Sequence, residues 1–170
     1  PDARCVFPEA PLALAGVYGD ARAWWLLDLA SLDRPRDRRG ELPDGLAAAR
    51  AQLSALLDAL AAPRLVLGGF SQGAMLALDV ALHRDRPPDA LALLSGTLIA
   101  EAEWQPRLAR LAGVPILQAH GEHDPLLPFA VAEELRDRLG AAGARVTWHP
   151  FEGGHEVPPD VVAALAALVR

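Results

Sequence analysis

The stretch that decides the fold is LVLGGFSQGAMLAL, residues 65–78. Residues 65–70 form a continuous apolar run, which predicts a strand buried on both faces of a sheet. The residues after Ser71 predict a helix over 72–83. Between strand and helix, residues 69–73 fit the pattern G-x-S-x-G in the structural context that this motif requires. We therefore expect a tight turn that exposes the Ser71 hydroxyl above the sheet.

The two glycines of this turn have a steric explanation. A turn this tight strains the Ser71 backbone, and we expect side chains at Gly69 and Gly73 to collide. The backbone N–H of Gln72 begins the helix and would point toward an oxyanion formed beside Ser71. The alternative is an ordinary serine in a glycine-softened turn.

The rest of the chain repeats the alternation of strand and helix. Short apolar strands are expected at 4–7, 90–94, 114–119 and 145–151, and helices at 42–60, partly at 101–112, at 128–139 and at 159–170. This pattern predicts an α/β fold with a mostly parallel sheet and helices on both faces. At 170 residues, we expect a single domain over 1–170.

Composition excludes several classes of function. The net charge is −6, and no arginine cluster carries interleaved aromatic residues, so we expect no nucleic-acid partner. All 16 basic residues are arginine, which excludes a lysine Schiff base, a P-loop lysine and Ser–Lys catalysis. The longest apolar run, 161–169, is shorter than the roughly 20 residues of a membrane helix, so we expect no integral membrane segment.

Cysteine use and the chain start bear on location. Cys5 is the single cysteine, so no internal disulfide forms, and we expect a reducing, cytoplasmic location with Cys5 as a small buried residue. The first residues lack the charged and apolar pattern of a cleavable leader, so we expect none in this sequence. The sequence begins at Pro1 without methionine, so we expect either a processed chain or a piece of a longer one.

Three loops that follow strands each carry one candidate catalytic group. They hold Ser71, Asp124 and His155, in the chain order of an α/β-hydrolase triad. A serine hydroxyl needs a base, which His155 could supply, and the base needs a carboxylate such as Asp124 to orient it. Because the carboxyl ends of parallel strands share one sheet edge, these groups can meet there.

Other residues compete for these roles. The alternatives for the base are His120, His123 and His149, and those for the carboxylate are Glu122 and Glu156. A metal site at His120, His123 and Asp124 is a further alternative, although a dedicated site would need its own third or fourth ligand and a second shell. We therefore expect no metal.

Five apolar residues in loops are candidates for a substrate pocket. Trp24 and Trp25 are either pocket wall or core. Leu12, Leu98 and Leu126 could line an acyl pocket or simply pack beneath their loops.

The residues also match a known family. The matching stretches, in family order, are Phe7-Pro8-Glu9-Ala10-Pro11, Ala23-Trp24-Trp25 with Asp28, Leu67 through Ala74, Leu94-Ser95-Gly96, Gln118 through Gly121 with Asp124 and Pro128, and Gly154-His155. The chain resembles the phospholipase/carboxylesterase branch of the α/β-hydrolases, which includes the acyl-protein thioesterases. The resemblance implies Ser71 as nucleophile, Asp124 and His155 as its partners, and Gln72 N–H as an oxyanion donor. It also implies a carboxylic ester or thioester substrate and no cofactor.

The chain departs from this family at its start. The family carries strands before the Phe7-Pro8 stretch, and a His-Gly-rich loop that supplies the second oxyanion N–H. It also has a strand between the 4–7 strand and the elbow strand. We therefore expect an N-terminally short member of the family. Either the strand at 4–7 pairs directly with the elbow strand, or the place of the missing strand is filled by another subunit or by the rest of a longer chain. A homo-oligomer follows from the subunit alternative.

Taken together, these features predict a serine carboxylesterase that hydrolyses small ester substrates, with thioesters and lysophospholipids left open. The tryptophans and the negative net charge favour an apolar acyl group. The alternative is a catalytically impaired hydrolase that only binds or assembles.

Overall fold

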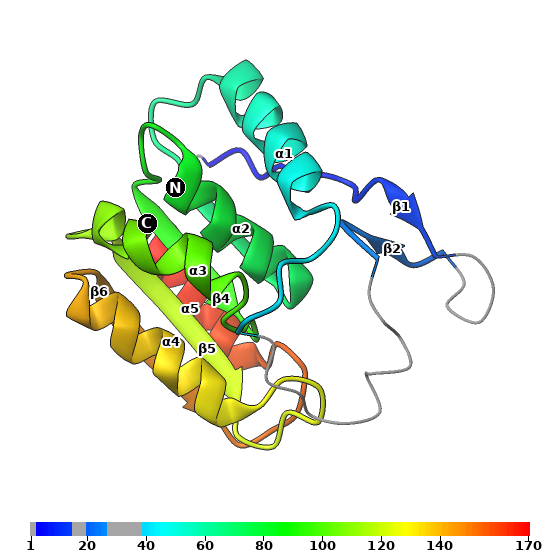
Figure 1. The fold of residues 1–170 in the computed structure, drawn as a ribbon. Helices are drawn as coiled ribbons and strands as arrows, with labels where there is room; N and C mark the ends of the chain where they lie inside the picture. Colours follow the sequence, from blue (N-terminus) through cyan, green and yellow to red (C-terminus); the bar gives the residue numbers. More distant parts are fainter. Residues whose placement is uncertain (1–2, 15–19, 27–38) are drawn as a thin grey trace.

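The computed structural model describes residues 3–14, 20–26 and 39–170. At its centre lies a parallel sheet of four strands in the order β3-β4-β5-β6 (Figure 1). These strands are β3 (Val66–Phe70), β4 (Ala90–Leu94), β5 (Pro115–Gly121) and β6 (Arg145–Phe151). A separate antiparallel ribbon pairs β1 (Leu12–Ala13) with β2 (Arg22–Ala23). We call residues 12–14 and 20–25 the β1–β2 ribbon.

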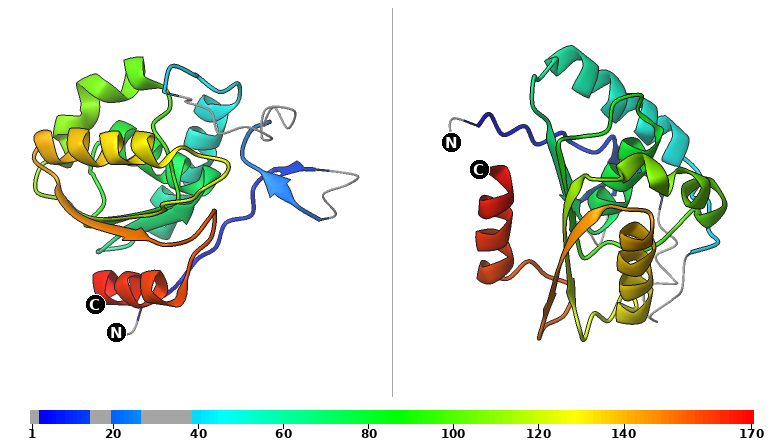
Figure 2. Two further views of the ribbon diagram at one scale, coloured as in Figure 1. Left: turned by 90° about the horizontal axis from the view of Figure 1, so that it is seen from below. Right: turned by 90° about the vertical axis from the view of Figure 1, so that its left-hand side faces the viewer.

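Helices cover both faces of the sheet, which confirms the predicted fold class. They are α1 (Leu46–Leu60), α2 (Gln72–His83), α3 (Glu101–Trp104) with the 3₁₀ helix η2 (Gln105–Leu111), α4 (Phe129–Ala141) and α5 (Pro159–Val169). Figure 2 shows α5 on one face and α1, α2 and α4 on the other. Because every crossover between parallel strands contains a helix, the carboxyl ends of all four strands lie at one edge.

The two faces carry cores of different size. The larger core joins α1, α2, η2 and α4 to the sheet around residues such as Leu78, Leu91 and Trp104. The smaller core lies beneath α5 and contains Leu94, Leu117, Ala119, Phe151 and Val161. Within the described ranges no helix is both long and apolar enough to cross a membrane.

The helix predicted over 42–60 begins later than expected. Leu42 is 59% exposed, and α1 starts at Leu46. Pro43 and Gly45, which has a φ of 97°, separate Leu42 from the helix, because a left-handed residue cannot continue a right-handed helix. By contrast, the predicted helix 72–83 and the predicted strands 90–94 and 145–151 are confirmed residue for residue.

The strand predicted at residues 4–7 is wrong. Residues 3–10 form no strand, Phe7 is 90% exposed, and Cys5 is exposed instead of buried. An apolar stretch is buried as a strand only when a neighbouring strand pairs with it, and β3 pairs with β4. The expected direct pairing of this segment with the elbow strand therefore does not occur.

The burial predicted for the elbow strand is also wrong. β3 lies at an end of the sheet order, and its Gly68 and Phe70 are exposed. The strand buried along its whole length is β4, which has neighbours on both sides. An apolar run is compatible with a strand at the end or in the middle of the sheet. The burial of such a strand depends on how many neighbouring strands pair with it.

Candidate active site

The turn after β3 has the geometry of a strained nucleophile elbow. Ser71 has a φ of 54° and a ψ of −120°, a region that costs a non-glycine residue about 1–3 kcal/mol. A Cβ at Gly69 would lie 2.3 Å from the backbone carbon of Gly73, whereas a Cβ at Gly73 would meet nothing within 4 Å. The expected collision is therefore correct for Gly69 and wrong for Gly73.

The structure brings together the three side chains predicted for the site. His155 Nε2 lies 2.8 Å from Ser71 Oγ, and His155 Nδ1 lies 2.7 Å from Asp124 Oδ2. Ser71 follows β3, Asp124 follows β5, and His155 follows β6. An unbroken chain of hydrogen bonds thus crosses the carboxyl edge of the sheet.

Asp124 is held as a carboxylate by its surroundings. Burial alone would raise its pKa, but hydrogen bonds from His155 and from the N–H groups of Leu127 and Leu126 bring the pKa below its ordinary value. Both of those N–H groups donate to Oδ1, at 2.8 and 2.9 Å. Oδ2 therefore faces His155, and the carboxylate is fixed in one orientation.

The loop that carries His155 is fixed against β5 and β4. A Cβ at Gly121 would lie 2.2 Å from the carbonyl oxygen of Gly154, so only a glycine allows this close approach. Ser95 Oγ, at the end of β4, donates to the carbonyl of Glu156 at 3.3 Å. The ring of Phe70 packs on the His155 imidazole with centroids 4.8 Å apart.

The competing histidines have other environments. His120 is fully buried; its Nε2 lies 3.1 Å from the Leu127 carbonyl oxygen, and burial lowers its pKa. His149 bonds to Asp160 on the surface at 2.9 Å, and His123 is exposed. His155 is the histidine that bonds to Ser71.

The competing carboxylates also lie elsewhere. Glu122 is exposed, and Glu156 accepts the N–H of Gly154 at 3.2 Å. Asp124 is the carboxylate that bonds to His155.

The alternative metal trio of His120, His123 and Asp124 is not assembled. In the part of the chain that the structure describes, one group of three brings its ligand atoms within 4.8 Å of one another: Asp79, His83 and Glu103. The Arg50 guanidinium already lies within this group, donating to Asp79 at 2.5 Å and to Glu103 at 3.0 Å. Since a guanidinium supplies the positive charge there, these residues form an ion-pair network between helices.

We call this second group, Arg50, Asp79, His83, Glu103 and Trp104, the helix network. Asp79 is fully buried, and Trp104 Nε1 donates to its Oδ1 at 2.9 Å. Sequence reasoning did not single it out. The available signal was a lone aspartate inside the apolar run of α2, since a buried charge requires partners.

The five predicted pocket residues fall into two groups. Trp25 and Leu98 are 2% and 1% exposed and belong to the larger core, so they have almost no surface for a ligand to touch. Leu12, Trp24 and Leu126 keep exposed surface, and their pocket role stays a prediction.

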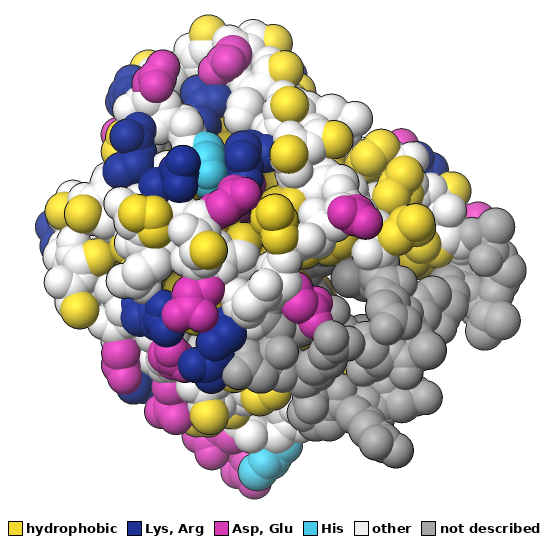
Figure 3. Space-filling view, in the orientation of Figure 1, with side chains coloured by type: hydrophobic (Ala, Val, Ile, Leu, Met, Phe, Trp, Pro, Cys, Tyr) yellow, Lys and Arg dark blue, Asp and Glu magenta, His cyan; other side chains and the backbone are white. Residues whose placement is uncertain are grey.

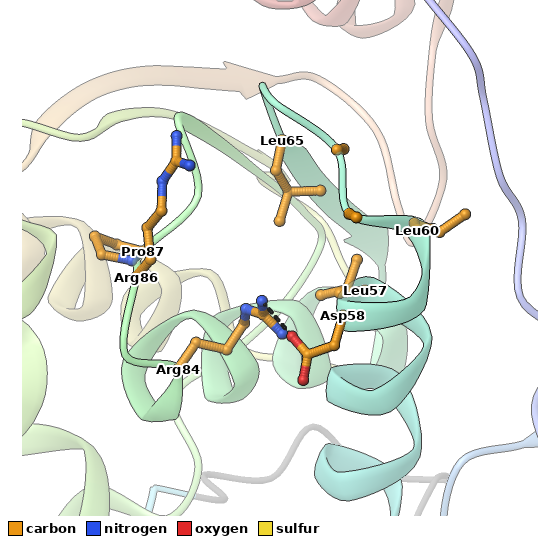
Figure 4. A pocket seen from close by; sticks show the side chains of 9 residues that line it. Leu57, Asp58, Leu60, Leu65, Arg84, Arg86 and Pro87 are labelled. Carbon is orange, nitrogen blue, oxygen red and sulfur yellow. Dashed lines mark ion pairs between the residues drawn. The ribbon is translucent and has the colours of Figure 1, made fainter.

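A cavity of about 220 Å³ lies beside Leu65, just before the amino end of β3, whereas Ser71 follows the carboxyl end of that strand. Figure 4 shows the side chains that line it. It is lined by the end of α1, the start of β3 and the residues that follow α2, and the Arg84–Asp58 ion pair crosses it at 2.8 Å. No member of the triad lines it. It therefore has no part in the chemistry at Ser71.

Comparison with known proteins agrees with this fold. The model of the Phospholipase/Carboxylesterase family matches residues 1–170. The chain belongs to this family. Within it, acyl-protein thioesterase 1 of Schizosaccharomyces pombe is 30% identical over 157 residues, which cover 87% of this chain and 68% of that protein. Acyl-protein thioesterase 1 of Neurospora crassa is 27% identical over 166 residues, covering 91% and 67%.

Solved structures of the family share the fold. The crystal structure of esterase PE8 has a TM-score of 0.76 and 29% identity, and covers 96% of this chain and 75% of that chain. The Bacillus cereus carboxylesterase has a TM-score of 0.62 and 26% identity, with 77% and 72% covered. This family member thus spans about two thirds of the two thioesterases, and the likenesses support a hydrolase of the esterase type.

Proposed function

We propose that this chain is a serine esterase that hydrolyses carboxylic esters through an acyl-enzyme on Ser71. The observation that carries the proposal is the hydrogen-bond chain from Ser71 Oγ through His155 to Asp124. The same chemistry extends to thioesters, which the names of the thioesterase relatives favour, and to lysophospholipids.

The first half of the reaction forms the acyl-enzyme. Ser71 Oγ attacks the carbonyl carbon of the ester while its proton passes to His155 Nε2. Asp124 Oδ2 accepts the Nδ1–H of the resulting imidazolium and stabilises its charge. The oxyanion accepts the Gln72 N–H, which as the first helical N–H of α2 has no acceptor within the helix. The alcohol or thiol then leaves with the proton from His155.

The second half releases the acid. His155 Nε2 takes a proton from water, whose oxygen attacks the acyl carbon. The new tetrahedral intermediate collapses, and Ser71 Oγ leaves with the proton held on His155. The products are the carboxylic acid and free enzyme, and the proposed reaction uses no cofactor.

The deciding experiment is the intact mass of the protein after incubation with a fluorophosphonate, with Ser71→Ala alongside. We expect one added label on the wild type and none on the variant, together with hydrolysis of p-nitrophenyl esters by the wild type only. Half-buried Ser54→Ala, in α1, is the matched control and should label fully. Folded wild-type protein that takes no label would overturn the proposal and favour the alternative of a hydrolase fold that only binds or assembles.

A further inference from the structure

The side chain of Gln72 has a role separate from its backbone N–H. Its Oε1 accepts the backbone N–H of Trp24 at 2.7 Å, and its Nε2 donates to the carbonyl of Trp25 at 3.1 Å. The side chain is buried, with the residue only 9% exposed. One amide thus satisfies both a donor and an acceptor of a two-residue segment from a distant part of the chain.

These bonds join the β1–β2 ribbon to the residue that follows the nucleophile. The ribbon projects from the side of the molecule, away from the four-stranded sheet (Figures 1 and 2). At its end Trp25 enters the larger core, and the Gln72 side chain bonds to the backbone on either side of the Trp24–Trp25 peptide link. Without these two bonds, a partly buried N–H and a buried C=O would lose their partners, which is costly.

The surface held in this way is apolar. Leu12 is 36% exposed, Leu26 is 74% exposed, and Trp24 is half-buried. Phe70, on the other side of Ser71 in sequence from Gln72, is 39% exposed. Figure 3 shows hydrophobic side chains gathered over the β1–β2 ribbon.

We propose that the Gln72 side chain is a positioning residue that holds the β1–β2 ribbon beside Ser71 as the wall for the acyl chain. The enzyme then prefers medium-chain acyl esters over acetyl esters. This inference rests on the proposed function. Each methylene that contacts such a wall adds up to about 0.8 kcal/mol, or about fourfold, to binding. Loosening the wall therefore penalises long acyl chains more than acetate.

The test compares Gln72→Met with wild type on p-nitrophenyl octanoate and p-nitrophenyl acetate. Methionine keeps the length and volume of glutamine but makes neither hydrogen bond. We expect the ratio of kcat/KM for octanoate to kcat/KM for acetate to fall about tenfold, mainly through KM for octanoate. Gln72→Glu keeps the acceptor for Trp24 N–H, but its carboxylate would face the Trp25 carbonyl, so it should lose the preference for octanoate as well. Gln52→Met, exposed on α1, is the matched control and should match wild type.

Two results would overturn this role. Equal losses on both esters would show that the variant acts on the oxyanion N–H or on the fold, and equal rates for variant and wild type would show that the bonds are unimportant. Circular dichroism and thermal unfolding identify a variant that fails to fold. In that case Gln72→Glu, which retains one bond, gives the decision.

A second measurement separates this inference from the proposed function. Hydrogen exchange of the Trp24 amide reports the bond to Gln72 without any substrate, and we expect it to become about tenfold faster in Gln72→Met than in Gln52→Met. Unchanged exchange contradicts the anchoring role. If wild-type protein takes no fluorophosphonate label, the proposed function and the acyl preference fail together, while the exchange result still decides whether Gln72 anchors the ribbon.

Discussion

We call Ser71, Asp124 and His155 the strand-end triad. This triad and the helix network each place a buried aspartate beside a histidine, yet the other contacts of the two groups differ. Asp79 receives two bonds from Arg50 and one from the Trp104 indole, so both its oxygens are satisfied by fixed donors. Asp124 has one oxygen held by backbone N–H groups and the other turned to His155. The first carboxylate is neutralised in place, and the second directs its charge at an imidazole.

The second nitrogen of each histidine separates the two groups further. His155 Nε2 faces the hydroxyl of Ser71, which strained backbone holds at the end of β3. His83 Nε2 lies 3.7 Å from the Glu103 carboxylate, and its Nδ1 lies 2.8 Å from the Asp79 carbonyl oxygen. An aspartate–histidine pair therefore supports nucleophilic chemistry only where a third group can give up a proton, and elsewhere it holds helices together.

The largest expected effect comes from Asp124→Asn. The N–H groups of Leu126 and Leu127 keep the amide oxygen in the Oδ1 position, so the amide NH₂ faces His155 Nδ1. That contact favours the tautomer with its proton on Nε2, which cannot accept the Ser71 proton. We expect kcat for p-nitrophenyl ester hydrolysis to fall about 10⁴-fold with the fold intact. A loss below about tenfold would show that Asp124 does not orient the base.

Asp79→Ala should instead affect stability. It leaves the buried Trp104 indole N–H without its acceptor and the Arg50 guanidinium with Glu103 as its remaining carboxylate, at a cost of about 3 kcal/mol in the free energy of unfolding. Asp58→Ala breaks the more exposed pair with Arg84 and should cost about 1 kcal/mol or less. Urea unfolding measures both, and fluorophosphonate labelling of the folded fraction should be unchanged. Equal losses would contradict the contrast between buried and exposed pairs.

A third comparison lies within the elbow. Gly69→Ala places a Cβ 2.3 Å from the Gly73 backbone and should destabilise the protein by about 3 kcal/mol or displace Ser71. Gly73→Ala meets nothing within 4 Å inside a helix, so we expect stability within about 1 kcal/mol of wild type, or higher. Thermal unfolding and fluorophosphonate labelling of the two variants check this. Equal stability and equal labelling of Gly69→Ala and Gly73→Ala would contradict the steric difference between the two positions.

The smallest effect concerns His120, which lies 3.5 Å from Asp124. Burial lowers its pKa from the ordinary 6.5. As pH falls below that value, the unfolded chain binds a proton that the folded chain does not. Folding stability is therefore lost with falling pH, by at most about 1.4 kcal/mol per pH unit.

His120→Gln removes this titration while keeping a donor for the Leu127 carbonyl. Urea unfolding between pH 7 and pH 5 should show a shallower loss of stability in the variant than in wild type. An equal or steeper loss would contradict the assignment.

The features of the fold that were predicted correctly depend on interactions between residues close in the sequence, and those predicted wrongly depend on residues far apart in it. Residues 69–73 carry the elbow in five consecutive positions, and the apolar run of β4 and the alternating pattern of β6 indicate strands locally, so these were predictable. The short apolar segment at 4–7 has the same local pattern, but no strand pairs with it. Periodicity reports what a segment prefers and says nothing about whether a neighbour exists to bury it.

The same reasoning applies to the candidate site. Ser71, Asp124 and His155 each follow a strand, and parallel strands bring their ends to one edge, so sequence order and topology together predicted the group. The bond from the Gln72 side chain to Trp24, and the pairing of Asp79 with Arg50, join residues that no spacing rule connects. Those contacts depend on how the helices and the ribbon pack.

By itself, the sequence determined the α/β alternation and the elbow with Ser71, and it placed the candidate bases and carboxylates in loops at one sheet edge, because these features depend on local backbone preferences and on the shared edge of a parallel sheet. Only the tertiary structure decided which histidine meets Ser71, which glycine of the elbow is sterically required, and that the elbow strand lies at an end of the strand order. The physical reason is that these outcomes depend on distances between separate elements, which packing sets and chain order does not encode.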